Sequence, residues 1–426
     1  MVVAGIKRGS LVVIMQDVKT THDKHNTKGL IKIAAAILKT DLAIAIAIAI
    51  TWQILFTFIG SLFDASLNNI FQRNIAPPTT LLSHTYGWDS GWYEAIIKGA
   101  YSDPTSAASV FYPLFPLLVK TIHIFSFEKL DILRIGLLIN TTSLALAIYS
   151  LKKIAGHFLP ANYHWWLPIL FITSPAAIFM HLFYTEALFC GIAFGAYMFA
   201  LQRKWLYMGI LLGLLTATRL PAILIIGLCG LEFIRSYNWN IKAVFNKNLL
   251  YFLLAPIGYM AYGIYLYIVR GDFFSMSNGY KLTNDWPYQV FNPNIFETFH
   301  SGLTHLYSVF TSGIPFDEGQ SVNFFIPIVG LFLLLATSFY AIIIMRKSIG
   351  IPLGIFGIVA IVFFTINSNF ISVGRYLLPC VVIYISILHL AIRNKALNGI
   401  FYLFCYGGVL LQAYLLILFV NGYFAG

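Results

Sequence analysis

The residues of this chain that could do chemistry are ionisable side chains that interrupt otherwise apolar sequence: Asp89, Glu94, Glu186, Arg219 and Arg375. Ionisable groups at membrane depth are energetically costly, so they usually face a cavity and carry function. Each of the five is expected at the end of an apolar helix or just beyond it, all on the same side. Acids and bases gathered at one depth would suit an anionic lipid headgroup.

Asp89 is the candidate general base. It lies in the run Gly87-Trp88-Asp89-Ser90-Gly91-Trp92-Tyr93-Glu94, as a lone carboxylate between two indoles. Indoles often anchor a protein at the membrane interface, which accounts for Trp88 and Trp92 but not for Asp89. A positioned carboxylate can accept a proton from a hydroxyl during the reaction. The alternative is that Asp89 only caps a turn, a role that Asp fills well.

Glu186 and two arginines are candidate partners of Asp89. Glu186 follows Tyr184 and begins an apolar helix, where a carboxylate interacts favourably with the helix dipole even without a catalytic role. Arg219 lies where two apolar segments meet, and Arg375 opens a further one, followed by Tyr376. Snorkelling of long side chains to the interface would explain both arginines. A guanidinium also binds phosphate in a bidentate manner, so both are predicted to contact a phosphate.

Composition places these residues in a membrane protein. Of the 426 residues, 59% are hydrophobic and 10% are charged, whereas soluble domains carry about 25% charged residues. The excess of 27 Lys and Arg over 16 Asp and Glu marks cytoplasmic loops in such a protein, rather than a nucleic-acid partner. The four cysteines lie in apolar stretches without the spacing of metal ligands, so they are predicted to be buried and unreactive.

The elements that position the candidate residues are predicted transmembrane helices. A helix needs roughly 20 apolar residues to cross a bilayer, and this criterion predicts an all-α bundle of about eleven spans. They fall near residues 42–62, 132–151, 165–181, 184–201, 205–218, 220–234, 249–268, 322–345, 350–366, 375–391 and 398–420. The pairs Gly191/Gly195 and Gly209/Gly213 have the spacing that allows close helix packing.

Basic residues between the spans set the expected topology. A cytoplasmic N-terminal tail, residues 1–41, precedes a single transmembrane domain, residues 42–426, with external loops at 64–131 and 270–321. The pairs Lys152-Lys153 and Arg203-Lys204 then lie inside, as the positive-inside rule requires. This holds if Phe111 to Phe127 is an amphipathic helix at the outer interface. If that segment crosses instead, the next four loops invert.

Five short motifs, in order, resemble the PIG-V family. They are Trp88-Asp89-Ser90-Gly91-Trp92-Tyr93 with Tyr101 downstream, Phe111-Tyr112-Pro113-Leu114-Phe115-Pro116, Tyr184-Thr185-Glu186-Ala187-Leu188-Phe189, Thr218-Arg219 and Gly374-Arg375-Tyr376. Eukaryotic members of that family add the second mannose in GPI-anchor synthesis, and the family belongs to the GT-C glycosyltransferases. The chain departs from the pattern at Trp92, which is His in eukaryotic members, and at Lys98-Gly99-Ala100-Tyr101, which replaces a usual Gly-Tyr ending.

The resemblance implies a polyprenyl- or dolichyl-phosphate sugar donor, an external or lumenal active site, and a catalytic acid in the first external loop, where Asp89 stands. This site would lie outside the plasma membrane in a prokaryote, or in the endoplasmic reticulum lumen in a eukaryote. The acceptor is expected to be a glycolipid or glycan hydroxyl. Mannose is the expected sugar, transferred with inversion.

The residue roles predicted from these patterns form one site. Asp89 is the base, Arg219 and Arg375 bind the donor phosphate, and the remaining candidates contact substrate: Trp88, Trp92, Tyr93, Glu94, Tyr184, Glu186 and Tyr376. No cofactor or metal is expected, since His300 and His305 do not share a helical face.

A lipid or solute transporter would have a similar composition, but the internal repeat that many transporters carry is not found. A non-catalytic assembly subunit is a third possibility.

Overall fold

The computed structural model describes residues 24–70, 81–282, 292, 294–311, 324–346, 350–366 and 370–423. The chain divides into two compact units, Met1–Ile44 and Ala45–Gly426. The first is described only as the beginning of one helix, and every side-chain contact discussed below lies within the second. Within the described ranges the regular elements are helices and no strand occurs, so the all-α prediction is confirmed for this part of the chain.

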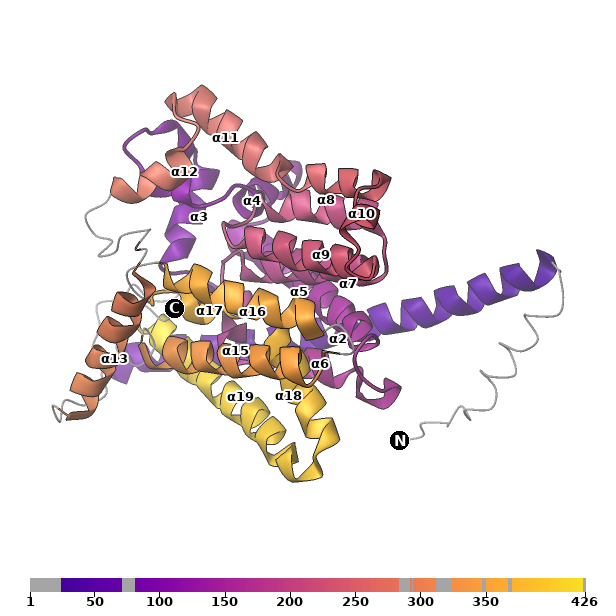
Figure 1. The fold of residues 1–426 in the computed structure, drawn as a ribbon. Helices are drawn as coiled ribbons and strands as arrows, with labels where there is room; N and C mark the ends of the chain where they lie inside the picture. The colour runs from indigo at the N-terminus through magenta and orange to yellow at the C-terminus, as the bar shows by residue number, and fades with distance from the viewer. Residues whose placement is uncertain are drawn as a thin grey trace. The chain divides into compact units, whose positions relative to one another are not determined.

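The longer helices appear in Figure 1 in chain order. They are α2 (Lys24–Ile70), α3 (Asp89–Ile97), α4 (Leu114–Phe125), α5 (Ile132–Ala155), α6 (Trp166–Ile172), α7 (Glu186–Leu201), α8 (Trp205–Leu215), α9 (Ala222–Ser236), α11 (Ile257–Arg270), α13 (Ile295–Thr311), α15 (Ile326–Ile343), α16 (Gly350–Thr365), α18 (Val381–Arg393) and α19 (Asn398–Val420). Short elements between them include α10 (Ile241–Val244), α12 (Ser275–Asn278), α17 (Val373–Tyr376) and the 3-10 segments η5 (Pro175–Met180) and η6 (Lys247–Leu254).

Five segments among the described residues are long and apolar enough to cross a membrane: Thr40–Phe63, Ile132–Ala155, Lys247–Arg270, Ile326–Ile343 and Asn398–Val420. Five further apolar helices are shorter, with 10 to 17 residues each. The predicted count of eleven spans is therefore not confirmed. Parts of the predicted tail and of both predicted external loops lie outside the described residues.

Three segments predicted as continuous spans are interrupted beside prolines. In the predicted span 165–181, α6 ends at Ile172 and Pro175 begins the 3-10 segment η5. The predicted span 249–268 changes from η6 to α11 at Pro256, and the predicted span 375–391 is divided at Pro379 into α17 and α18. Proline lacks an N–H group and its ring clashes with the preceding turn, so it disrupts a helix that apolarity alone would continue.

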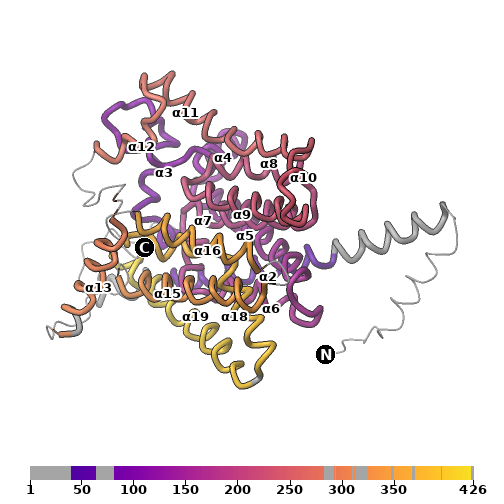
Figure 2. The backbone as a smooth tube through the Cα atoms, in the orientation of Figure 1, coloured from indigo at the N-terminus to yellow at the C-terminus, as the bar shows by residue number. Residues whose placement is uncertain are grey.

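Glycines allow the central helices to approach closely. α7 packs against both α5 and α8, and α15 lies beside α16 (Figures 1 and 2). A Cβ atom at Gly191 would lie 2.6 Å from the Ser143 carbonyl oxygen, and one at Gly213 would lie 2.7 Å from that of Leu254. These contacts are too short for any side chain. The two glycine pairs predicted to mediate packing therefore do so.

The segment that follows α3 is held by the end of α11. The Arg270 guanidinium donates hydrogen bonds to the carbonyl oxygens of Tyr101, Ser106 and Ala100, at 2.8, 2.9 and 3.2 Å. The Tyr262 hydroxyl donates to the Ser109 carbonyl oxygen at 2.7 Å. These bonds fix the segment between α3 and α4, and with it the C-terminal side of the helix that begins at Asp89.

α4 matches the amphipathic helix predicted at Phe111 to Phe127. Its 12 residues extend about 18 Å, less than the roughly 30 Å of a hydrocarbon core. Phe115 and Val119 are buried, whereas Leu117 and Phe125 are exposed. The helix is therefore too short to cross a bilayer by itself, and its interfacial placement stays a prediction.

Candidate active site

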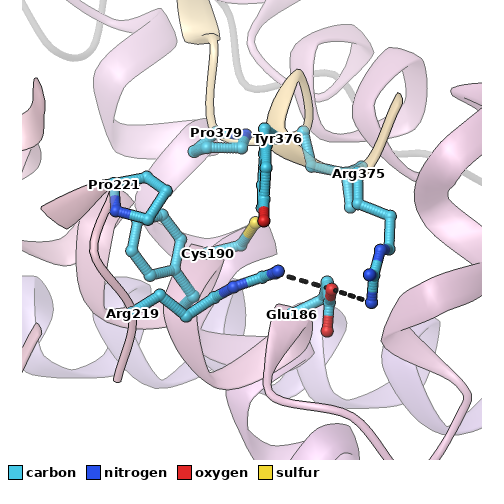
Figure 3. Close-up of a pocket in the computed structure, with 9 residues that line it drawn as sticks. Glu186, Cys190, Arg219, Pro221, Arg375, Tyr376 and Pro379 are labelled. Carbon is cyan, nitrogen blue, oxygen red and sulfur yellow. Dashed lines mark hydrogen bonds and ion pairs between the residues drawn. The ribbon is translucent and has the colours of Figure 1, made fainter. Parts of the chain in front are cut away.

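Four charged side chains from distant parts of the chain meet in one buried group. Asp89 and Glu186 are the first residues of α3 and α7, Arg219 lies in the turn between α8 and α9, and Arg375 belongs to α17. We call these four residues the charge cluster. Arg219 and Arg375 reach Glu186 from opposite sides (Figure 3).

The charge cluster is a linear series of ion pairs. Arg375 Nη1 donates to Asp89 Oδ2 at 2.6 Å and to Glu186 Oε1 at 3.2 Å, and Arg219 Nη1 donates to the same Glu186 oxygen at 2.6 Å. The exposed fractions of the side chains are 4% for Arg375, 2% for Glu186, 14% for Arg219 and 17% for Asp89. The two negative charges and the two positive charges neutralise one another, and buried charges are stable only when they are paired in this way.

Asp89 is thus not the lone carboxylate that its sequence context predicts. Its partner Arg375 lies 286 positions away, and the two neighbouring indoles point to other contacts. Trp88 Nε1 donates to the Tyr423 carbonyl oxygen at 3.0 Å, and Trp92 stacks on Phe111 with 5.6 Å between ring centroids. The environment of Asp89 is set by an ion pair rather than by indoles.

Aromatic rings surround the two arginines. The Arg375 guanidinium lies 5.2 Å from the centroid of the Tyr184 ring and 5.5 Å from that of Phe179, and the Arg219 guanidinium lies 4.9 Å from that of Tyr376. Such cation–π contacts stabilise a guanidinium removed from water. The Tyr184 hydroxyl also accepts a weak bond from the Asp89 backbone N–H at 3.4 Å.

Tyr93 lies within the electrostatic field of the charge cluster. It packs edge-on against Phe115 with a centroid distance of 5.4 Å. Burial raises the pKa of Tyr93, and the negative charges of Glu186 and Asp89 raise it further, whereas Arg219 and Arg375 oppose the shift. The hydroxyl therefore stays protonated and can act as a hydrogen-bond donor near the cluster.

Two residues of the site escaped the sequence prediction. Ser372 precedes α17 with a φ of 66°, and its Oγ accepts a bond from Arg375 Nη2 at 2.7 Å. A serine at this spacing predicts a helix N-cap, but the Ser372 side chain makes no capping bond and contacts the guanidinium instead, so its role had no signal in the sequence. Phe179 had no signal either, since one more phenylalanine in an apolar segment is unremarkable in sequence.

The backbone at Trp88 is strained. Its φ of 50° and ψ of −111° are unfavourable for a bulky side chain, and such conformations cost about 1 to 3 kcal/mol. Strain of this kind persists only where surrounding contacts impose it. Asp89 follows directly, so the contacts that hold the cluster also hold this turn.

A cavity of about 10 Å³ adjoins the two arginines, which is room for about one water molecule. It is lined by Glu186, Phe189, Cys190, Arg219, Pro221, Arg375, Tyr376, Leu378 and Pro379 (Figure 3). Glu186 Oε2 and Arg375 Nε are buried and have no hydrogen-bond partner in the part of the chain that the structure describes. The site thus retains one unused acceptor and one unused donor.

Glu94 lies outside the charge cluster. It is five residues after Asp89 on α3, a spacing that points the two side chains to different helix faces. Its carboxylate accepts a bond from Lys98 Nζ at 2.6 Å and another from the Tyr86 hydroxyl. The bond from Lys98, followed by that from Tyr86, lowers the pKa of Glu94. Glu94 is therefore ionised, already paired and a weak base.

The donor set of the site suits an anion. Two guanidinium groups lie within one cluster, and guanidinium geometry matches phosphate oxygens. No group of three or more His, Cys, Asp or Glu side chains with metal-binding geometry occurs among the residues that the structure describes.

Comparison with known proteins gives little further guidance. No family model matches the chain, and no curated protein matches it. Among solved structures, the chain is similar to the oligosaccharyltransferase of Archaeoglobus fulgidus tethered with an acceptor peptide, with a TM-score of 0.42 and 14% sequence identity. The match covers 88% of this chain and 56% of that one. The likeness is weak, and no chemistry follows from it.

Proposed function

We propose that the protein is a multi-pass membrane glycosyltransferase of the GT-C kind. It transfers a sugar, which we take to be mannose, from a polyprenyl- or dolichyl-phosphate donor to a hydroxyl of a glycolipid or glycan acceptor. The observation that carries this proposal is the buried charge cluster, in which a carboxylate lies 2.6 Å from one of two guanidinium groups. The PIG-V-like motifs support it, since their charged residues are the four that meet there.

In the proposed reaction Asp89 accepts the proton of the acceptor hydroxyl, and that oxygen attacks the anomeric carbon of the sugar. The bond between the anomeric carbon and the phosphate oxygen breaks, and its electron pair stays on the lipid phosphate. Arg219 and Arg375 stabilise the charge that develops there. A single displacement inverts the anomeric configuration, and a phosphate leaving group needs no proton, so one base is enough.

The neighbouring side chains are proposed to orient the substrates. Glu186 holds both arginines and can accept a bond from a sugar hydroxyl through its unused oxygen Oε2. Tyr93, Tyr184 and Tyr376 offer hydroxyls and ring faces beside the cluster. Trp88 is partly exposed, and together with Trp92 and Glu94 it is proposed to meet the acceptor.

The site is proposed to face the external or lumenal side of the membrane. The scheme needs no metal or cofactor, since the chain's own arginines neutralise the phosphate. The lipid-linked sugar is a co-substrate.

The proposal is tested with purified protein in detergent and polyprenyl-phosphate carrying radiolabelled mannose, with a panel of glycolipid and glycan acceptors. We expect acceptor-dependent release of polyprenyl phosphate and transfer of label with inverted configuration. A matched polyprenyl-phosphate-glucose reports the sugar preference. Transfer from a nucleotide sugar, with none from any polyprenyl-phosphate sugar, would refute the donor class.

A further inference from the structure

Arg375 and Asp89 have roles in the proposed reaction that conflict with their observed contact. Arg375 is to bind the donor phosphate and Asp89 is to accept a proton, yet the two are paired at 2.6 Å. The Asp89 oxygen that faces the cluster, Oδ2, already accepts a hydrogen bond from Arg375 Nη1, so an acceptor hydroxyl cannot donate its proton there. The observed arrangement is therefore an inactive state of the site.

The arrangement also leaves little space for a phosphate beside Arg375. The cavity beside the arginines has a volume of about 10 Å³, enough for one water molecule but not for a group with four oxygens. The Arg375 side chain is almost fully buried. A phosphate can reach this guanidinium only if one of its carboxylate partners leaves.

Of the two carboxylates, Asp89 is the one that is free to leave. Glu186 is held by both arginines and is the more deeply buried. Asp89 is held by one arginine, is more exposed, and follows the strained residue Trp88. Moving Asp89 breaks one ion pair and can relax the strained turn, whereas moving Glu186 breaks two.

We propose that the donor phosphate displaces Asp89 from Arg375, so that binding of the donor itself frees the catalytic base. This inference rests on the proposed function. Ser372 holds Arg375 Nη2 in place, and Arg375 Nε lacks a partner among the described residues. An incoming phosphate oxygen binds at the Nη1 position that Asp89 vacates. The donor must then bind before the acceptor is activated.

The test measures direct binding of geranyl phosphate, a soluble prenyl phosphate without a sugar, to the full-length protein in detergent. A ligand binds more weakly when its binding-competent state is rarely populated. If Asp89 occupies Arg375 more than nine-tenths of the time, Asp89→Asn binds geranyl phosphate at least about tenfold more tightly than wild type. Asp89→Glu keeps the competing charge and should bind like wild type.

Asp103→Asn is the matched control. Asp103 lies in the same predicted external loop, is exposed, and accepts a hydrogen bond from the Thr105 backbone N–H. Its replacement therefore removes one negative charge without changing a contact of Arg375. Its affinity should equal that of wild type. Equal affinities of Asp89→Asn and Asp103→Asn would overturn the displacement while leaving the donor class intact. If neither wild type nor any folded variant binds geranyl phosphate, the displacement and the donor class both fail.

A measurement on wild type covers the case in which Asp89→Asn does not fold. An apolar carbodiimide modifies carboxyl groups that are not held in ion pairs, and mass spectrometry of the peptides locates the adduct. Geranyl phosphate should increase modification of Asp89 several-fold, with Glu186 unchanged as an internal control. Protection of Asp89, or no change, would overturn the displacement.

Discussion

Asp89 and Glu94 lie on the same short helix but have different partners. Substituting each in turn therefore distinguishes the loss of a catalytic base from the loss of a negative charge at the surface. Asp89→Asn keeps the shape but cannot accept a proton, and we expect the turnover number to fall by about 10²- to 10⁴-fold. Glu94→Gln disrupts the pair with Lys98 and Tyr86 and should change the turnover number less than about threefold, while its proposed contact with the acceptor would appear as a higher KM for the acceptor. Steady-state kinetics with polyprenyl-phosphate-mannose measures both. The reverse ranking would make Glu94 the base.

Arg375→Lys tests whether guanidinium geometry matters. Arg375 uses Nη1 for two carboxylates and Nη2 for Ser372, and a single ammonium group cannot reproduce that planar arrangement. We expect turnover to fall by about 10²-fold, as for the loss of one transition-state donor, with the protein still folded by thermal unfolding in detergent. Arg134→Lys, in the exposed pair with Asp131, is the control. Equal kinetics for both variants would remove Arg375 from the site.

At the scale of the elements, the orientation of α4 determines the topology. Ser102 is exposed, between α3 and α4, and Ala161 is exposed between α5 and α6. A cysteine at Ser102 should react with an impermeant thiol reagent added outside intact cells, whereas a cysteine at Ala161 should react only after permeabilisation. Ser90 is unsuitable because it is buried and bonds to the Phe183 carbonyl. Outside labelling of Ala161 would mean that α4 crosses the membrane.

The contact between α5 and α7 depends on a glycine. Gly191→Ala would place a methyl group 2.6 Å from the Ser143 carbonyl oxygen, and we expect such overpacking to lower the free energy of unfolding by about 1 to 3 kcal/mol. Gly227 in α9 has open space around it, so Gly227→Ala should raise stability by about 0.5 to 1 kcal/mol. Thermal unfolding in detergent compares the two. Similar shifts for both variants would argue against close packing at Gly191.

At the scale of the whole chain, the C-terminal helix α19 packs against the residues that hold the charge cluster. Phe419 is buried, lies edge-on to Tyr184 at 6.0 Å and occupies the space beside Gly87. Phe419→Ala leaves a cavity beneath the Asp89 turn, so we expect a loss of about 3 to 5 kcal/mol in stability and about 10²-fold in turnover from misplacement.

Leu410→Ala is the matched control for Phe419→Ala. It truncates an exposed side chain on the same helix, and both stability and turnover should stay near wild type. Full activity of a folded Phe419→Ala variant would show that α19 does not position the site.

The sequence by itself determined the helical class and the chemically capable residues. Composition and long apolar segments require helices, because a helix satisfies its own backbone hydrogen bonds without water. The cost of placing charge in apolar sequence singled out five residues, and the structure brings four of them together: Asp89, Glu186, Arg219 and Arg375. Glycine spacing predicted the close helix contacts in the same local way.

The tertiary structure alone decided which charges pair. Pro175 already signals in the sequence that α6 must stop, but only the structure shows that Gln412 of α19 donates hydrogen bonds to the carbonyl oxygens of Ile172 and Ser174 at this break. The pair between Asp89 and Arg375 joins residues 286 positions apart, and Glu94 points away although it is only five positions from Asp89. Whether two charged side chains pair depends on the distance between the helices that carry them, and the sequence does not give that distance.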